Sequence, residues 1–238
     1  MKVNIFIPCF IDQLFPQTAV NMVKVLRKIG CQVEYNPNQT CCGQPAYNAG
    51  FGEQAQPVCE KFVNDFAGKE LIVTPSASCV GFVRNHYKSI FDKTDLQIKA
   101  QQVRNNIIEF SDFLVNYIKI DDFGAELKGK ATYHDACAAL RECGIKRPPR
   151  QLLSKVKGLE LIESEDCEEC CGFGGTFSTK FEPISVAMAD KKIETALALG
   201  VDYIISTDLS CLMHLEGCIK QRQLPLKVMH IADVLVAE

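Results

Sequence analysis

The triplet Cys-Cys-Gly occurs twice in this chain, as Cys41-Cys42-Gly43 and as Cys170-Cys171-Gly172. Two thiolates on neighbouring residues repel each other and need a shared positive counter-charge, which a metal centre supplies and an apolar core does not. The glycine that follows lacks a Cβ atom, so the backbone can turn tightly there and approach a bulky ligand. The repetition therefore predicts two metal-binding loops of the same kind.

Cysteine is abundant throughout, with 13 among 238 residues. In a short secreted chain such a count indicates a disulfide framework. This chain is long and its cysteine count is odd. The apolar run in residues 1–10 is too short for an export signal and is more typical of a first strand. Metal ligation is therefore favoured over disulfide bonding, and we expect a cytoplasmic protein.

The charge and hydropathy of the chain argue against two classes of partner. The net charge is −3 at pH 7 and there is no long basic run, so nothing attracts nucleic acid or anionic lipid in general. No stretch of about 18 consecutive apolar residues occurs, so we expect no helix that crosses a membrane. The 47% hydrophobic and 23% charged residues are typical of a globular protein.

Short apolar runs alternate with stretches of helical periodicity along the whole chain. The alternation predicts an α/β fold with mostly parallel sheets built from βαβ units. The predicted strands are residues 3–7, 33–35, 71–73, 131–134, 159–162 and 203–205. The predicted helices are residues 16–29, 53–66 and 184–199, residues 107–114 are expected to close a helical stretch, and residues 121–129 are expected to form a linker.

The cysteines of the first half recur in the second half at nearly constant spacing, which predicts two pseudo-symmetric repeats, residues 1–124 and 125–238. The offset from Asp112 to Asp233 is shorter, so the first repeat carries about eleven extra residues near 91–101, in a surface insertion. We expect each repeat to be a small parallel sheet flanked by helices. The offsets are 128 residues from Cys9 to Cys137, 129 from Cys41 to Cys170 and 132 from Cys79 to Cys211.

Each half thus offers four cysteines that follow a predicted strand or its loop. The carboxyl ends of parallel strands share one edge of a sheet, so these thiols should meet there. Four thiolates suit either a tetrahedral zinc ion or a four-iron four-sulfur cluster, and the lack of paired, closely spaced cysteine knuckles favours the cluster. We expect one pocket per half, with Cys9, Cys41, Cys42 and Cys79 in the first and Cys137, Cys170, Cys171 and Cys211 in the second.

The spacing Cys-x31-Cys-Cys-x36-Cys, repeated as Cys-x32-Cys-Cys-x39-Cys, resembles the cysteine-rich "CCG" domain pair. That pair occurs in the B subunit of heterodisulfide reductase and in iron–sulfur subunits of glycolate and anaerobic glycerol-3-phosphate oxidation. Residues 40–48, 170–178 and 228–235 narrow the resemblance to standalone two-repeat members that serve lactate utilisation. The resemblance covers essentially the whole chain.

This resemblance implies an iron–sulfur electron-transfer subunit with one 4Fe-4S cluster in each repeat. The four cysteines of each repeat would be the ligands of its cluster. It also implies two partners, a ferredoxin-like iron–sulfur B subunit and a C subunit, in a complex that oxidises a 2-hydroxy acid, L-lactate, to pyruvate. The chain would then be the iron–sulfur component of an oxidoreductase complex rather than the catalyst that binds the substrate.

The chain departs from the fuller family motif, which ends in Cys-x-x-Cys and supplies five cysteines per repeat. The corresponding positions here are Phe82 and His214. With four cysteines per repeat, the disulfide chemistry of the heterodisulfide reductase branch is less favoured than simple electron transfer. His214 is a further candidate ligand, although Phe82 at the equivalent position favours a packing role for it.

The other cysteines are interpreted first as small apolar residues. Cys167 forms Cys-x-x-Cys with Cys170, so a ligand or redox role is a hypothesis for it, but its acidic neighbours should raise its thiol pKa and make it less nucleophilic. We expect packing roles for Cys31, Cys59, Cys143 and Cys218.

Three further polar residues lie near the second quartet in sequence: His134, Asp135 and Asp208. An acid–base pair there could move protons together with electrons. Packing and hydrogen bonding within loops is the favoured interpretation of all three.

Two rival functions use the same cysteines. The first is a zinc-stabilised interaction module without redox activity, which would be colourless where an iron–sulfur protein is brown. The second is a thiol–disulfide reductase of the heterodisulfide type, which would have to form a strained disulfide ring between adjacent cysteines.

Overall fold

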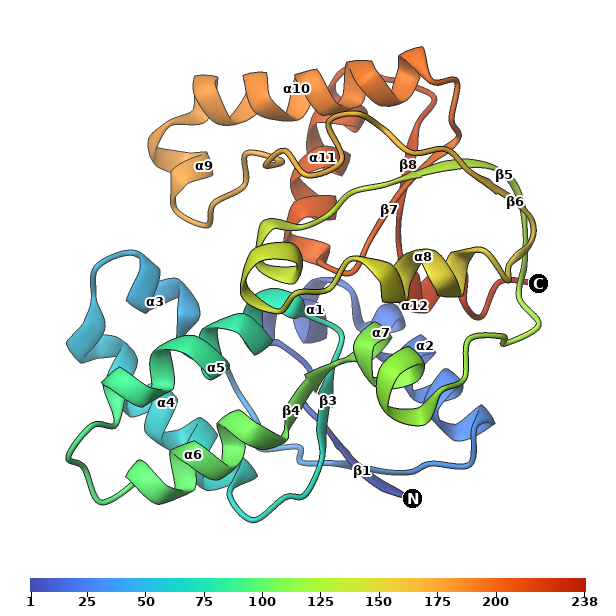
Figure 1. Ribbon diagram of the computed structural model, residues 1–238. Coiled ribbons are helices and arrows are strands. Elements are labelled where there is room, and N and C mark those ends of the chain that lie inside the picture. The colour runs from blue at the N-terminus through green and yellow to red at the C-terminus, as the bar shows by residue number, and fades with distance from the viewer.

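The computed structural model describes residues 1–238 as two α/β halves, each built on a four-stranded sheet in which every pair of neighbouring strands is parallel (Figure 1). The strand order is β2-β1-β3-β4 in the first half and β6-β5-β7-β8 in the second. The two sheets therefore share one topology, in which the central strands β1 and β3 of the first half correspond to β5 and β7 of the second. The predicted fold class and the predicted repeat are both confirmed.

The strands are β1 (Lys2–Ile5), β2 (Gln32–Tyr35), β3 (Ile72–Thr74), β4 (Ile107–Glu109), β5 (Glu126–Tyr133), β6 (Lys157–Leu161), β7 (Tyr203–Ser206) and β8 (Lys227–His230). The helices of the first half are α1 (Cys9–Leu14), α2 (Pro16–Lys28), α3 (Gln44–Asn48), α4 (Gly52–Phe66), α5 (Ala77–Ile90), α6 (Gln97–Asn106), α7 (Phe110–Asp112) and the π-helical η1 (Phe113–Ile118). Those of the second half are the π-helical η2 (Ala138–Glu142), α8 (Arg147–Leu153), α9 (Phe177–Lys180), α10 (Glu182–Ala198), α11 (Leu209–Gln221) and α12 (Ile231–Val234).

Helix α2 illustrates how local sequence sets the boundaries of an element. Pro16 occupies its first turn, where the missing N–H costs nothing, and Gly30 follows its end with φ of +79°. Its apolar face, which includes Met22 and Leu26, is fully buried. The predicted helix over residues 16–29 is therefore confirmed.

Two predictions about the elements are wrong. Residues 107–114 do not close a helix, because Ile107–Glu109 form the edge strand β4, which pairs with β3, and helical structure begins only at Phe110. Residues 121–129 are not all linker, because β5 begins at Glu126 and pairs with β6 through a register shift before Gly129. The extra residues of the first half turn the chain and form α6, as the shorter offset predicts.

The halves are joined by contacts between helices α2, α7 and η1 of the first half and helices α8 and α12 of the second. Helix α12, at the end of the second half, packs between α2 and α8, and α7 with η1, at the end of the first half, packs on α8 (Figure 1). The Asp233 carboxylate accepts hydrogen bonds from Thr18 Oγ1 and Asn21 Nδ2, both at 2.8 Å. One core of 43 buried residues runs through both halves, so the division at residue 124 stays a prediction.

Helices cover both faces of each sheet, with α4, α5 and α6 on one side of the first sheet and α2 and α7 on the other (Figure 1). This arrangement leaves the carboxyl edge of each sheet free for the loops that carry the cysteines. None of the helices has the combination of length and apolarity that crossing a bilayer requires.

Candidate metal centres

Three loops bring the first cysteine quartet to the carboxyl edge of its sheet. Cys9 is the first residue of α1, a few residues beyond β1, and Cys79 lies in the first turn of α5, just beyond β3. Cys41 and Cys42 lie in the loop that follows β2. Since β2, β1 and β3 are parallel neighbours, all four residues leave the sheet on the same side.

Within this quartet the sulfur atoms are in direct contact. The Sγ atoms of Cys42 and Cys79 lie 3.4 Å apart, and the backbone N–H of Gly43 donates to Cys41 Sγ at 3.4 Å. Hydrogen bonds from the thiols of Cys42 and Cys9 lower the pKa of Cys41 to about 3. The same contacts raise the pKa of Cys9 and of Cys42 above the ordinary thiol value. Within the quartet, Cys41 is thus the thiol most readily ionised, whereas ionisation of Cys9 and Cys42 is disfavoured unless a positive charge is nearby.

The second quartet repeats these contacts. The backbone N–H of Gly172 donates to Cys170 Sγ at 3.4 Å, as that of Gly43 does in the first half. Hydrogen bonds from Cys137 and Cys171 lower the pKa of Cys170 to about 2, while those from Cys170 and Cys211 raise the pKa of Cys171. Equivalent cysteines therefore have the same electrostatic role in both halves.

Both Cys-Cys-Gly loops require glycine at their third position. Gly43 has φ of +92° and Gly172 has φ of +93°, in the left-handed region that other residues rarely adopt. A Cβ atom on Gly43 would lie 2.4 Å from the Sγ of Cys59, and one on Gly172 would lie 2.4 Å from the backbone oxygen of Ser185. The tight turn and close approach that the sequence predicts are both present.

All eight cysteines line a single cavity of about 470 Å³ between the two halves. The expectation of one separate pocket per half is therefore wrong. The cause is the mutual orientation of the halves, since α5 of the first packs on η2 of the second and the two carboxyl edges face each other. The apolar side chains of Phe6, Phe10 and Phe173 also contribute to the lining.

The donor set suits a soft, thiolate-binding metal group. Each half offers four sulfur atoms to the cavity, and burial together with the neighbouring thiols penalises a negative charge on Cys42 and on Cys171. Iron–sulfur clusters and zinc both relieve that penalty through their own positive charge. The residues present therefore fit such a group, and their assignment as ligands stays a prediction.

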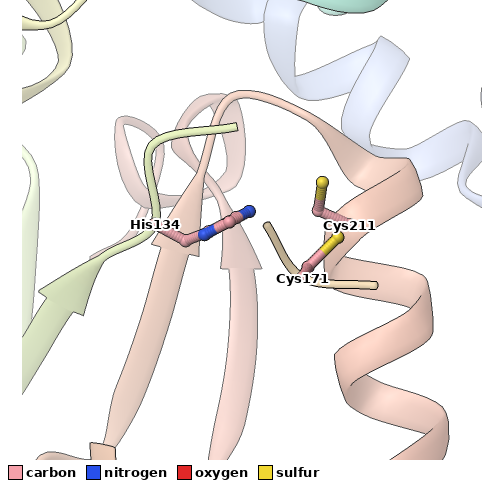
Figure 2. A group of neighbouring side chains, drawn as sticks. All are labelled: His134, Cys171 and Cys211. Atoms are coloured by element: carbon pink, nitrogen blue, oxygen red, sulfur yellow. The ribbon is translucent and has the colours of Figure 1, made fainter. Parts of the chain in front are cut away.

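His134 belongs to the second site more closely than the sequence predicts. One ring nitrogen and the sulfur atoms of Cys171 and Cys211 all lie within 4.8 Å of one another, and Figure 2 shows the imidazole extending toward both thiols. Only 2% of His134 is exposed, and neither ring nitrogen has a hydrogen-bond partner. Burial, reinforced by the charge of Lys192, lowers its pKa to about 3, so the ring is neutral.

The favoured interpretation of His134 is confirmed for packing, because the residue is buried, but is wrong for hydrogen bonding of its ring, which has no partner. The available signal was its position directly after a predicted strand and three residues before Cys137. The same interpretation holds for Asp135, whose carboxylate accepts hydrogen bonds from Arg150 at 2.7 and 2.9 Å. Asp208 caps α11 and also accepts the N–H of Ser78, in the other half, at 3.0 Å.

His214 faces away from the cavity. Its Nε2 lies 3.0 Å from Ser185 Oγ, which in turn donates to the backbone oxygen of Gly172. Through Ser185, His214 therefore supports the Cys-Cys-Gly loop from behind. Phe82, at the equivalent position, packs against Tyr47 in the same supporting place.

The remaining cysteines lie outside the cavity lining. Cys59, in α4, packs behind Gly43 and donates to the backbone oxygen of Cys42 at 3.4 Å, and burial raises its pKa to about 11. Cys143 donates to the backbone oxygen of Ala77 at 3.5 Å, which ties the two halves together. Burial and the charge of Asp135 raise the pKa of Cys167, in the direction that its acidic neighbours predict.

A family model described as "Cysteine-rich domain" (CCG) matches this chain twice, over residues 3–84 and 131–216. The first match contains every cysteine of the first quartet, and the second match contains every cysteine of the second. The chain belongs to the CCG cysteine-rich domain family. The two matches fall on equivalent parts of the two sheets, from β1 to α5 and from β5 to α11.

Curated CCG relatives match over almost their whole length. This chain is 40% identical over 235 residues to "Lactate utilization protein A" of Geobacillus sp. (strain WCH70), covering 99% of both proteins. It is 41% identical over 235 residues to the protein of that name from Halalkalibacterium halodurans, covering 99% of this chain and 96% of the relative.

Among solved structures, a hypothetical protein from Helicobacter pylori matches with a TM-score of 0.58 and 11% identity. The match covers 99% of this chain and 48% of that protein, so this chain spans about half of its length. At this identity the likeness concerns the fold alone.

Proposed function

We propose that this CCG protein is the iron–sulfur electron-transfer subunit of a system that oxidises L-lactate to pyruvate. The observation that carries the proposal is the single cavity into which both cysteine quartets open. Two thiol quartets on one cavity provide ligands for two clusters close enough in the fold to exchange electrons. The relatives named lactate utilization protein A, 40% identical over nearly the whole chain, supply the substrate class.

The residues divide the work in each half. Cys9, Cys41, Cys42 and Cys79 would hold one 4Fe-4S cluster, and Cys137, Cys170, Cys171 and Cys211 the other. A bound cluster supplies reversible one-electron transfer. The backbone N–H groups of Gly43 and Gly172 donate to thiolates and stabilise their negative charge, and the phenylalanines of the lining exclude water.

The partners proposed are a ferredoxin-like iron–sulfur B subunit and a C subunit. In this scheme the chain relays electrons that another component removes from the 2-hydroxy acid. The chain alone should therefore not convert lactate to pyruvate, whereas the complete set of subunits should.

The experiment compares Cys171→Ser with Cys59→Ser in protein purified without oxygen. Cys171 lies in the cavity and Cys59 lies behind it, although both are buried cysteines beside a Cys-Cys-Gly loop. Cys171→Ser should lose about half of the iron and acid-labile sulfide, because one of two clusters loses a ligand. Lactate-dependent electron flow through the assembled subunits should cease. Cys59→Ser should retain both properties.

Two outcomes contradict the proposal. Equal iron content and equal activity in the two variants would contradict the assignment of Cys171 as a cluster ligand. A colourless wild-type protein that holds zinc without sulfide would instead favour the zinc-stabilised interaction module, for which the group formed by His134, Cys171 and Cys211 is a suitable site.

A further inference from the structure

The two halves differ at one position that touches both the sheet and the metal site. His134 follows the last residue of β5, and Phe6, 128 residues earlier, follows the last residue of β1. This is the same offset that relates Cys9 to Cys137. Both side chains are buried, at 2% and 0% exposure. The fold therefore presents an imidazole to the second quartet at the place where it presents a phenyl ring to the first.

Behind the first quartet the surroundings are aromatic. The ring of Phe6 packs edge-on against Phe62 at 4.8 Å and against Phe66 at 5.7 Å between centroids. These rings offer no lone pair and no hydrogen-bond donor, so the first centre has only sulfur atoms from the quartet around it.

Behind the second quartet the same region is polar. Lys192, 130 residues after Phe62, is 6% exposed and pairs with the Asp166 carboxylate at 3.7 Å. A ring nitrogen that carries no proton has a free lone pair, which is the form in which histidine binds metals.

Geometry places that lone pair where a metal would be. The ligand atoms of His134, Cys171 and Cys211 lie within 4.8 Å of one another. A metal bound at roughly 2.3 Å from sulfur and 2.0–2.1 Å from nitrogen keeps tetrahedral ligand atoms about 3.5–3.8 Å apart, so small adjustments bring these three onto one ion. Both ring nitrogens of His134 are without a partner in an almost fully buried place, and a metal bound beside the two thiols would satisfy one of them.

We propose that His134 is a nitrogen ligand of the metal centre in the second half, so that the two centres of this protein are chemically different. The first centre is held by four thiolates. In the second, the His134 imidazole joins Cys171 and Cys211 and takes the place of Cys137 or Cys170 as the fourth ligand of the proposed cluster. The nature of the metal group rests on the proposed function, whereas the nitrogen ligand does not. A neutral ligand places less negative charge on iron than a thiolate does, so the second centre should have the higher reduction potential.

Two matched variants separate ligation from packing. His134→Phe gives the second half the residue that the first half has at Phe6, and His214→Phe gives it the residue found at Phe82. Both remove a histidine from behind the second quartet, but only His134 faces the thiols.

The measurement is pulsed EPR on the reduced holoprotein, prepared without oxygen and labelled with ¹⁵N only in its four histidines. The wild type and His214→Phe should show ¹⁵N coupling to one cluster. His134→Phe should retain iron and sulfide, lose the coupling, and shift the potential of one centre alone. If His134→Phe does not fold, His134→Gln serves instead, because it also removes the imidazole.

Clusters without histidine coupling in the wild type, or coupling that persists in His134→Phe, would overturn the proposal while leaving the proposed function intact. If the wild type holds zinc without sulfide, the proposed function fails and the nitrogen ligand is read from X-ray absorption. A zinc–nitrogen distance of about 2.0–2.1 Å should then be present in the wild type and absent in His134→Phe. Its presence in both would overturn the proposal.

Discussion

The first half and the second half have the same strand order, the same four thiols and the same glycine geometry, yet the surroundings of their thiols differ. The buried side chains behind the first quartet, Phe6 and Phe62, are aromatic. Those behind the second quartet, His134 and Lys192, are polar. The thiols proposed as ligands are thus alike in the two halves, and the side chains behind them are not. Two centres bound by these thiols would therefore have different surroundings on one chain.

The same contrast occurs at the helices that carry the last cysteine of each quartet. Helix α5 is capped within its own half by Ser76, whose Oγ accepts the N–H of Cys79. Helix α11 is capped by Asp208, whose second carboxylate oxygen reaches the N–H of Ser78 in the other half. One buried carboxylate therefore fixes the starts of both helices, and with them Cys79 and Cys211, relative to each other.

The largest difference between the halves is expected from alanine at the two loop glycines. Gly172→Ala places a Cβ atom against the backbone of Ser185, a clash that no second side-chain substitution can relieve. It should therefore cost about 4 kcal/mol of unfolding free energy and remove the second centre. Gly43→Ala meets only the Cys59 side chain. Adding Cys59→Ala should therefore restore about 2 kcal/mol in the first half.

Denaturant unfolding and iron content measure both effects. The control is Cys59→Ala alone, which should retain both centres. If Gly172→Ala and Gly43→Ala were equally rescued by Cys59→Ala, the close packing behind the two loops would not be what sets the requirement for glycine.

An opposite dependence on pH is expected from two equivalent residues, each of which caps the helix that follows the last strand of its half: Glu109 before α7 and His230 before α12. Burial raises the pKa of Glu109 to about 7, and burial lowers the pKa of His230. Stability from protonated Glu109 is complete below about 4.5 and is lost as pH rises through 7, amounting to about 2 kcal/mol between pH 5 and 7. Stability from neutral His230 is complete above about 6.5 and is lost as pH falls toward its folded pKa.

In the wild type these two slopes partly cancel, and single variants should expose each one. Because buried His134 also adds stability as pH rises, the comparison is made with the wild type: unfolding free energy should rise more steeply with pH in Glu109→Gln and less steeply in His230→Asn. Urea unfolding of the metal-free protein at pH 5, 6 and 7 measures the slopes. Parallel slopes in both variants and the wild type would show that these caps do not titrate as their burial implies.

A smaller difference is expected from the two equivalent aspartates. Asp233 accepts two hydrogen bonds from α2 at 2.8 Å, so Asp233→Ala should cost about 2 kcal/mol. Asp112 accepts from the exposed side chain of Asn116, one turn along, so Asp112→Ala should cost about 0.5 kcal/mol. Thermal unfolding of the two variants compares them directly. Equal costs would mean that the contact between α12 and α2 does not stabilise the protein.

The sequence predicts the parts of this protein that depend on local pattern. The helices over residues 16–29 and 184–199 follow from apolar spacing and terminal glycines, and the thiol quartets follow from the repeat. Strand β4 was missed because three strand residues run without a break into helical apolar spacing. The start of β5 was missed because its exposed residues are polar and its register shifts at Gly129.

The shared cavity and the role of His134 could not be predicted for a different reason. Nothing in the periodicity of either half specifies how the two sheets face each other, and that orientation decides whether the quartets share one cavity. His134 is distinguished from an ordinary packed histidine only by the lack of any partner for its ring, which is a tertiary property.

The packing of α12, in the second half, on α2, in the first half, has a consequence for the synthesis of the protein. The buried face of α2, near the start of the chain, is covered by α12, which ends four residues before the last residue. Helix α12 is synthesised long after α2, so the apolar face of α2 stays uncovered while the second half is being made. A chain interrupted before Ile231 should leave that face exposed, where proteases and chaperones can reach it. The cavity that both cysteine quartets line is likewise complete only after the second half has been made.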